Sequence, residues 1–383
     1  EAETFLSTTN ELRVTANYRI GKTQNTISGG VRFFYGKMHR QEGGLGTTGS
    51  DFDLTLLDPR YENDLIYTTT NVAPYVENIF RVTNRLSITP GFRFDFVNST
   101  ANGYVTDDNY TIISDKLKNR YIPLAGIGLQ YKTTATTSLY GNWSQAYRPI
   151  DYSALTPIGS TSVIDPKLKD ANGFNADLGI RGTVRNFLSF DISGFYLQYN
   201  NRIGLIEKTD ANGNTYTYQT NVANSRHVGA ETYVEINPVK AFTTVSKYGT
   251  ISFFNSFSSV DARYINGPYK NNFVENAPRF IERFGTTYAI EGFSVTFLVS
   301  HTSQCFSDAE NTVKSDDAVV GLVPSYTVLD LSATYKFKRI NVKAGLNNLT
   351  NEKYFTKRTD EYPGPGIIPA LGRSFYVGVG ARF

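Results

Sequence analysis

The chain is short of several kinds of residue, and each shortage excludes a class of protein. Its 383 residues include one cysteine, Cys305, so an intrachain disulfide is excluded. No run of about eighteen apolar residues occurs, which excludes a transmembrane helix. Basic residues number 38 against 35 acidic ones, so charge alone predicts no polyanionic partner. The chain does not open on a basic and apolar leader at Glu1, so we expect either that a signal peptide has been removed or that the start of the protein is absent.

Aromatic residues, by contrast, are abundant. The chain contains 26 tyrosines and 26 phenylalanines but a single tryptophan. Aromatic rings suit β-strands, and they also form the girdles at the two membrane–water interfaces of a transmembrane barrel. The composition by itself is equally typical of a β-rich soluble protein. Only the order of the residues can distinguish such a protein from a transmembrane barrel.

Apolar and polar residues alternate along one segment after another. Between positions 12 and 16, for example, Leu12, Val14 and Ala16 alternate with Arg13 and Thr15. Such alternation is what a wall between lipid and a wet lumen requires. No long amphipathic helix is predicted. About fifteen strand segments are predicted, beginning near positions 11, 26, 69, 86, 120, 137, 174, 187, 218, 249, 278, 293, 326, 340 and 372.

The predicted connections between the segments alternate between tight and long. The tight ones are residues 21–24, 83–85, 133–136, 184–186, 289–292 and 336–339. The long ones are residues 37–68, 99–119, 149–173, 261–276, 304–324 and 349–371. Barrels of the bacterial outer membrane have short periplasmic turns and long extracellular loops, a bias that a soluble sandwich has no reason to show. The sequence therefore predicts an all-β, antiparallel transmembrane β-barrel that crosses the bacterial outer membrane many times.

The odd number of segments suggests where the chain lies within such a barrel. Single-chain bacterial barrels have an even number of strands. If the last segment descends to the periplasm, the alternation of connections makes the segment near Leu12 descend as well. At least one strand then precedes Glu1, and we expect residues 1–383 to be the C-terminal portion of a larger barrel.

Several motifs resemble one known family. The last strand, residues 372–383, alternates and ends on Phe383, like the signal by which outer-membrane barrels are recognised for insertion. Residues 324–335, residues 344–355 with the sequence AGLNNLTNEKYF, and residues 224–231 are similar to segments of the TonB-dependent outer-membrane receptors. Further matches at residues 43–51, 71–80 and 88–95 most resemble the ferric dicitrate receptor subgroup.

The resemblance implies a barrel of about 22 strands with a globular plug inside it. This chain would then hold about 15 strands and would lack the plug, the TonB-contacting segment and about the first seven strands. The implied function is an outer-membrane receptor and transporter for an iron chelate, ferric citrate or another siderophore, which binds at the extracellular loops. TonB would act through the missing N-terminal segment. A passive or structural barrel, either a porin-like channel or a scaffold subunit of a surface complex, is the alternative.

Nothing in the sequence supports catalysis. The three histidines, His39, His227 and His301, have no orienting acid at a meaningful spacing. His301 and Cys305 together would make a weak metal site, because two ligands are too few. We expect no enzyme activity, no catalytic residue, no bound metal and no cofactor.

Ligand-binding candidates lie in the long connections, since a ferric citrate complex is anionic and guanidinium groups present paired donors to carboxylates. They are Lys37, His39, Arg40, Arg60, Arg148, Lys357, Arg358 and Tyr362. Each of the charged residues could instead be a solvated loop residue or could contact anionic lipopolysaccharide. The expected partners are therefore the iron chelate, TonB, outer-membrane lipid and lipopolysaccharide, and no nucleic acid.

Overall fold

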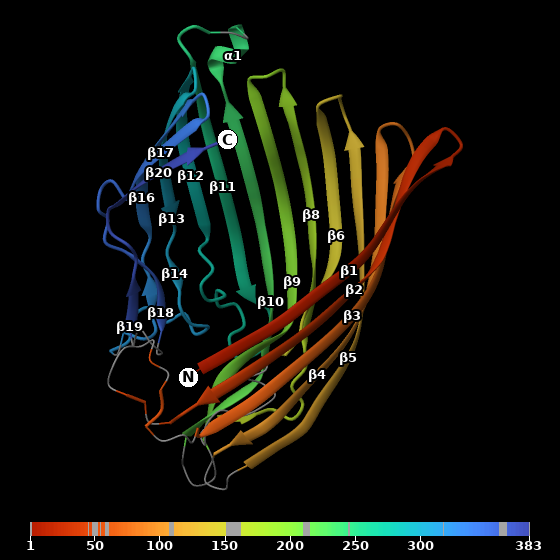
Figure 1. Cartoon of the computed structure of the whole chain (residues 1–383), viewed down its shortest axis with the longest axis vertical. Helices are drawn as coiled ribbons and strands as arrows, with labels where there is room; N and C mark the ends of the chain where they lie inside the picture. The colour runs from red at the N-terminus through yellow and green to blue at the C-terminus, as the bar shows by residue number, and fades with distance from the viewer. Residues whose placement is uncertain are drawn as a thin grey trace. The chain divides into compact units, whose positions relative to one another are not determined.

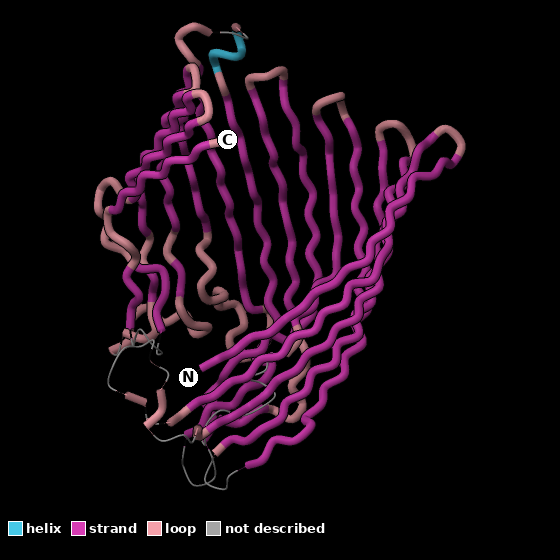
Figure 2. Tube along the Cα trace, in the orientation of Figure 1, coloured by secondary structure: helices cyan, strands magenta, loops and turns pink. Residues whose placement is uncertain are grey.

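The computed structural model of the chain consists almost entirely of β-strands (Figure 2). One short helix is present among the described residues, α1 (Pro238–Phe242), and no described helix is long and apolar enough to cross a membrane. The described residues are 2–44, 46–47, 53, 55–57, 61–106, 111–150, 162–209, 215–243, 246–316, 318–359 and 366–382.

The main sheet is antiparallel along its path, and its strands follow the chain order (Figure 1). Its strands are β1 (Ala2–Ile20), β2 (Thr23–Glu42), β3 (Asn63–Arg81), β4 (Leu86–Val105), β5 (Thr111–Lys132), β6 (Thr137–Arg148), β8 (Ala171–Val184), β9 (Leu188–Thr209), β10 (Thr215–Ile236), β11 (Thr250–Tyr264), β12 (Phe280–Ile290), β13 (Phe293–Thr302), β16 (Tyr326–Phe337), β17 (Ile340–Asn347) and β20 (Ser374–Ala381). A sixteenth strand, β7 (Ser162–Ile164), pairs with β10 in parallel.

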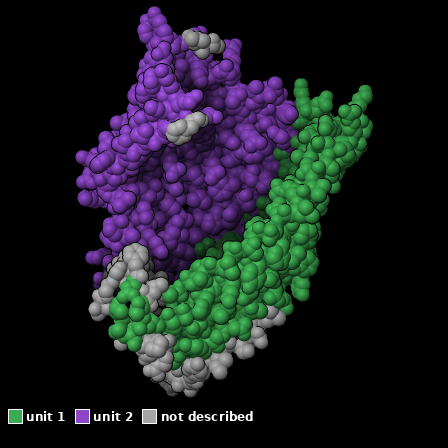
Figure 3. All heavy atoms as spheres, viewed as in Figure 1, with its two compact units in different colours: residues 1–129, 143–174, 199–222 green, residues 130–142, 175–198, 223–383 purple. Residues whose placement is uncertain are grey.

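Two small sheets lie outside this order. One pairs β14 (Cys305–Phe306) with β15 (Leu322–Val323), and the other pairs β18 (Phe355–Thr359) with β19 (Gly366–Pro369). The chain as a whole divides into two compact units (Figure 3). Unit 1 holds residues 1–129, 143–174 and 199–222, and unit 2 holds residues 130–142, 175–198 and 223–383.

The all-β, antiparallel prediction is confirmed, and each predicted segment corresponds to one strand of the main path. Several predicted boundaries are wrong, because the strands continue further than the apolar alternation does. The β2–β3 ladder extends to the pair Glu42↔Asn63, so the predicted connection at residues 37–68 shrinks to residues 43–62. A polar pair such as this one continues the ladder, because backbone hydrogen bonds join the two strands whether or not their side chains are apolar.

Tight turns form where residues with positive φ permit them. Between β12 and β13, Glu291 has φ 41° and Gly292 has φ 89°, the combination that two-residue hairpins favour. A Cβ at position 292 would lie 2.6 Å from the Lys336 carbonyl oxygen, so glycine is required there. The β10–β11 connection departs from the alternation, because residues 237–249 include α1, capped by the Asn237 side chain that accepts from Lys240 N at 3.1 Å.

The register gives the sheet of unit 1 an apolar and a polar face. Directly opposed residues share a face, and the row Phe33↔Val72↔Phe96 is apolar across β2, β3 and β4. Tyr75 and Arg93, which are also paired, occupy the other face. We call the face with Phe33, Val72 and Phe96 the apolar face, and the face with Tyr75 and Arg93 the polar face.

Unit 2 repeats the arrangement. The row Phe297↔Leu331↔Leu346↔Phe375 crosses four strands on its apolar face. One residue along, the row Thr296↔Ser332↔Gly345↔Tyr376 crosses the same strands on the polar face. The predicted period-two alternation is therefore confirmed in both units.

Candidate functional site

A cavity of about 410 Å³ lies on the polar face of unit 1, and we call it the outer pocket. It is at the end of β1–β3 that carries the long β2–β3 connection. The base of the pocket is well packed, because Met38 belongs to a buried apolar cluster with Leu65, Tyr67, Ala101 and Val105. The pocket is lined by Glu3, Phe5, Met38, Arg40, Thr69, Val97, Ser99, Arg120, Pro149 and Ile150.

Arg40 is the predicted ligand-binding residue that lines this pocket. Its guanidinium lies 2.6 Å from Glu3 Oε1, its cross-strand neighbour, and 3.7 Å from Glu42 Oε1. The Arg40 side chain is 15% exposed and that of Glu3 is 28% exposed, so water screens the pair only in part. An anionic ligand would therefore have to compete with Glu3 for the guanidinium.

Arg120 is the second guanidinium of the outer pocket, and its side chain is 4% exposed. Its Nε donates to Asp170 Oδ2 at 3.0 Å, and Asp170 also accepts from the Tyr147 hydroxyl and from Ile150 N. Arg120 donates further to Ser99 Oγ at 3.3 Å. A charge this deeply buried requires such partners, so Arg120 fixes the wall of the pocket around Ile150.

A second cavity of about 480 Å³, the inner pocket, lies further along unit 1. Arg13 donates to Glu11 at 2.6 Å and to the Tyr75 hydroxyl at 2.9 Å, and Arg93 is paired with Asp95 at 2.7 Å. The inner pocket is lined by Glu11, Arg13, Arg32, Tyr75, Val76, Glu77, Gly91, Phe92, Arg93, Leu124, Ala125, Gly126, Ser144 and Gln145.

Arg32 differs from the other guanidiniums of the two pockets. It makes neither a hydrogen bond nor an ion pair with any described residue. Eight residues of β2 separate Arg32 from Arg40, so the two lie about 26 Å apart along the strand on the same face. The polar face therefore carries arginines at its outer end and again far along the same strand.

The other predicted residues of unit 1 lie away from the outer pocket. Lys37 and His39 alternate with Arg40 and point to the opposite face of β2. His39 Nε2 lies 2.8 Å from Asp64 Oδ1, and Asp64 also accepts from Gln41. Arg148 is exposed at the last position of β6. Arg60 lies outside the described residues.

The remaining candidates lie in unit 2. Lys357 is exposed on β18. Arg358 donates to the carbonyl oxygens of Ala318 at 2.6 Å and Leu322 at 3.0 Å, so its guanidinium joins two loops. Tyr362 lies outside the described residues.

Sequence reasoning missed Glu3, Ser99, Arg120 and Asp170. Arg120 and Asp170 are fifty positions apart, and the sequence shows no signal that pairs them. The face of Arg40 follows from the observed extent of β2, in which Arg40 is eight residues from Arg32; the sequence had placed Arg40 in a connection. No group of three or more metal-ligating side chains occurs in the described part of the chain.

A family model supplies the deciding comparison. The model described as TonB dependent receptor-like, beta-barrel, matches residues 2–349. The chain belongs to the TonB-dependent receptor family. This family consists of transport receptors rather than enzymes.

Solved structures of TonB-dependent receptors and transporters have the same fold. The ferric citrate transporter FecA, in its unliganded form, superposes with a TM-score of 0.78 at 20% sequence identity, covering 100% of this chain. The ferric-catecholate import receptor Fiu from E. coli K12 gives 0.75 at 15% identity and 100% coverage of this chain. The siderophore receptor PiuA from Acinetobacter baumannii gives 0.74 at 17% identity and 98% coverage.

The chain spans about half of these structures. It covers 55% of the FecA chain, 55% of the Fiu chain and 56% of the PiuA chain. At such identities the likeness establishes the barrel fold of the TonB-dependent receptors, and the ligand is a separate question.

Proposed function

We propose that the chain forms part of the wall of an outer-membrane TonB-dependent receptor that takes up an iron chelate, ferric citrate or another anionic siderophore. In that setting the apolar face meets lipid and the polar face lines the lumen. The plug and the TonB-contacting segment belong, in this proposal, to the portion of the receptor outside residues 1–383. TonB then supplies energy through that portion.

The observation that carries the proposal is the outer pocket. It places the guanidinium of Arg40 on the polar face, at the end of the strands where the long connections of such barrels face the outside. The guanidinium is paired with Glu3. An incoming carboxylate of the chelate replaces Glu3, because both offer oxygens to the same planar donors.

Arg120 has a supporting part in this scheme. Its donors are occupied by Asp170 and Ser99, so it holds the pocket wall in place and leaves the exchange to Arg40. Arg32, which has no partner among the described residues, offers the next cation for an anion moving along the polar face. The route therefore runs from the outer pocket towards the inner pocket.

The test is titration of the full-length receptor with ferric citrate by isothermal calorimetry. Arg40→Ala removes a charge-assisted hydrogen bond that contributes about 1.5–3 kcal/mol, so the Kd should rise at least tenfold. Glu3→Gln should lower the Kd, because it frees the Arg40 guanidinium. Lys37→Ala, on the same strand but the opposite face, is the matched control and should leave the Kd unchanged.

Two results would contradict the proposal. Equal effects of Arg40→Ala and Lys37→Ala would show that the polar face does not select the ligand. Failure of the wild-type receptor to bind ferric citrate or any other anionic iron chelate would remove the iron-chelate function.

A further inference from the structure

A row of donor side chains crosses three strands of unit 2, and it contains none of the predicted ligand-binding residues. Its centre is Arg283 on β12, which is directly opposite Ser256 on β11 and Ser300 on β13. Directly opposed residues of an antiparallel sheet have Cβ atoms about 5 Å apart, so the guanidinium and the two hydroxyls can reach one small anionic group together. We call these three residues the donor row.

The register places the donor row on the polar face. Ser300 shares its side of β13 with Thr296, which lies on the polar face. Arg283 and Ser256 are opposed to Ser300 along one line across the sheet, so they lie on the same face. In the proposed barrel this face lines the lumen, and an anion would approach the donor row from there.

The side chains of the donor row are uncommitted. Neither Arg283 nor Ser256 nor Ser300 has a side-chain hydrogen bond or an ion pair with any described residue. Arg283 is exposed, and the two serines are partly buried. The row therefore presents a free guanidinium between two free hydroxyls.

No carboxylate lies next to Arg283 on this face. The carboxylates that β10 and β16 contribute to the polar face, Glu231, Glu235 and Asp330, are two strands away. An arginine that no neighbouring acid neutralises gives this part of the face a positive potential, which attracts an anion. The neighbouring positions on the same face of β11, β12 and β13 are Phe254, Ser258, Ile281, Gly285, Leu298 and Thr302.

An aromatic ring borders the donor row on the side of the tight turns. Gly285 follows Arg283 on the same face of β12, and a Cβ at this glycine would collide with the Phe254 ring, so the ring lies over Gly285. A ring in this position shields one side of the donor row from water. Electrostatic attraction is stronger where less water surrounds the charges.

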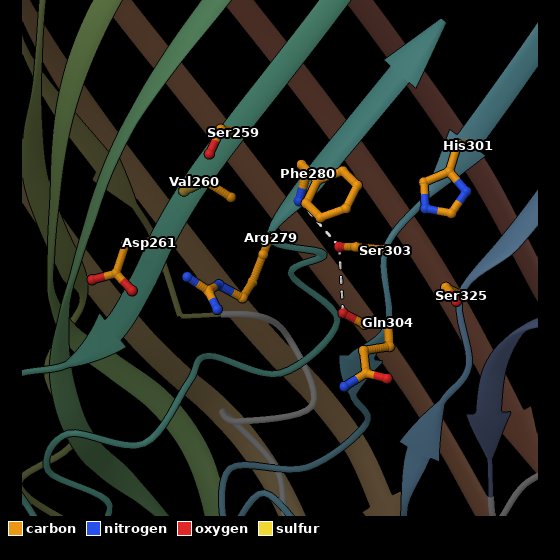
Figure 4. A pocket seen from close by; sticks show the side chains of 9 residues that line it. All are labelled: Ser259, Val260, Asp261, Arg279, Phe280, His301, Ser303, Gln304 and Ser325. Carbon is orange, nitrogen blue, oxygen red and sulfur yellow. Dashed lines mark hydrogen bonds between the residues drawn. The ribbon is translucent and has the colours of Figure 1, made fainter.

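A cavity of about 510 Å³, the rim pocket, lies at the long-connection end of the same strands (Figure 4). Arg279 lines it, and its carbonyl oxygen accepts from Val260 N at 2.9 Å, so Arg279 is opposite Val260 and has the parity of Arg283. The two arginines are about 13 Å apart along the strand direction. Arg279 has no hydrogen bond from its side chain and no ion pair with any described residue, whereas Asp261 is paired with Arg263 at 2.9 Å. The rim pocket is lined by Ser259, Val260, Asp261, Arg279, Phe280, His301, Ser303, Gln304 and Ser325.

We propose that the donor row is a second anion-binding site, which takes a carboxylate of the iron chelate after the chelate has passed Arg279. The inference rests on the proposed function for the identity of the anion, and it adds a specificity-determining cation in unit 2 to Arg40 of unit 1. The Arg283 guanidinium presents two parallel donors to one carboxylate, and the serine hydroxyls donate to the lone pairs that remain. Such a site selects a chelate that keeps a free carboxylate and discriminates against a neutral one.

The test is arginine footprinting of the full-length receptor, with phenylglyoxal as the reagent and mass spectrometry to measure the modification of each arginine. Without ligand, Arg283 should react several times faster than Arg93, whose guanidinium is paired with Asp95. Iron-free citrate and ferric citrate should each slow the modification of Arg283 at least fivefold. Arg226, exposed on the opposite face of the same unit, is the internal control, and its modification should not change.

Binding of ferric citrate to variants of the receptor is measured by isothermal calorimetry. Arg283→Gln should raise the Kd at least tenfold. Arg283→Lys should raise it less, because lysine keeps the charge but not the paired donors. Arg226→Gln is the matched control and should leave the Kd unchanged. The heat-dependent shift of barrels on gels verifies that each variant is folded.

Two footprinting results would overturn the assignment. One is an Arg283 that reacts as slowly as Arg93 without ligand, and the other is an Arg283 that neither form of citrate protects. Ferric citrate binding that responds to Arg40→Ala but not to folded Arg283→Gln would keep the proposed function and discard the donor row. If the wild-type receptor binds no iron chelate but iron-free citrate protects Arg283, the transport proposal is discarded and the anion site stands.

Discussion

Replacing Leu331 by arginine tests the assignment of the two faces most directly. Leu331 is the sixth of twelve residues in β16, and it lies in an apolar row between Phe297 and Leu346. An arginine on the lipid face near the bilayer midplane costs about 2–4 kcal/mol of folding free energy. No carboxylate is in this row to pair with the new charge, so we expect the full penalty.

Ser332→Arg is the internal comparison. Ser332 is the next residue of the same strand, but its row on the polar face contains Thr296, Gly345 and Tyr376. An arginine there reaches water, and the cost should stay below about 1 kcal/mol. The free energies of unfolding are measured by urea titration of the full-length receptor in lipid vesicles, followed by fluorescence. Equal destabilisation by the two substitutions would refute the alternation.

Three further outcomes are expected. Burial raises the pKa of the Cys305 thiol. Alkylation of this thiol in the folded protein should therefore be slow at neutral pH and should accelerate as the pH rises. An alkylation rate at neutral pH equal to that of a free thiol would contradict this burial. An epitope tag at Gly46 should be accessible to antibody on intact cells and one at Ala135 should not, and detection of Ala135 alone would invert the orientation. Arg358→Ala removes hydrogen bonds to two backbone carbonyls and should speed proteolysis of the connection at residues 303–325 severalfold, whereas exposed Lys357→Ala should not.

The strands were predictable because alternation with period two is a local property of the sequence. Leu12, Val14 and Ala16 reveal a strand whatever the rest of the chain does. The strand ends were not predictable, because polar pairs such as Glu42↔Asn63 are joined by backbone hydrogen bonds and add nothing to the hydrophobic pattern of the sequence. Helix α1 was not predicted, because its five residues are too few to show a helical period in the sequence.

The candidate site was only partly predictable. Residue type and position in a long connection identified Arg40, and its distance along the strand from Arg32 gives its face. The same reasoning from residue type selected Arg358, whose guanidinium the structure shows bound to backbone carbonyls of its own unit. The pairing of Arg120 with Asp170 depends on the meeting of β5 with the region just before β8, which no local pattern encodes.

The two loops that follow β11 and β13 are joined by reciprocal hydrogen bonds, which matters for engineering. Asn311 Oδ1 accepts from Phe273 N at 2.7 Å, and Asn311 Nδ2 donates to the Phe273 carbonyl at 2.8 Å. Asn272 Nδ2 donates to the Ala309 carbonyl at 2.9 Å. A surface segment cut from between β11 and β12 would leave these amides and carbonyls without partners. Transplanting this part of the surface into another receptor would therefore require moving both segments as one cassette, with Asn311 retained.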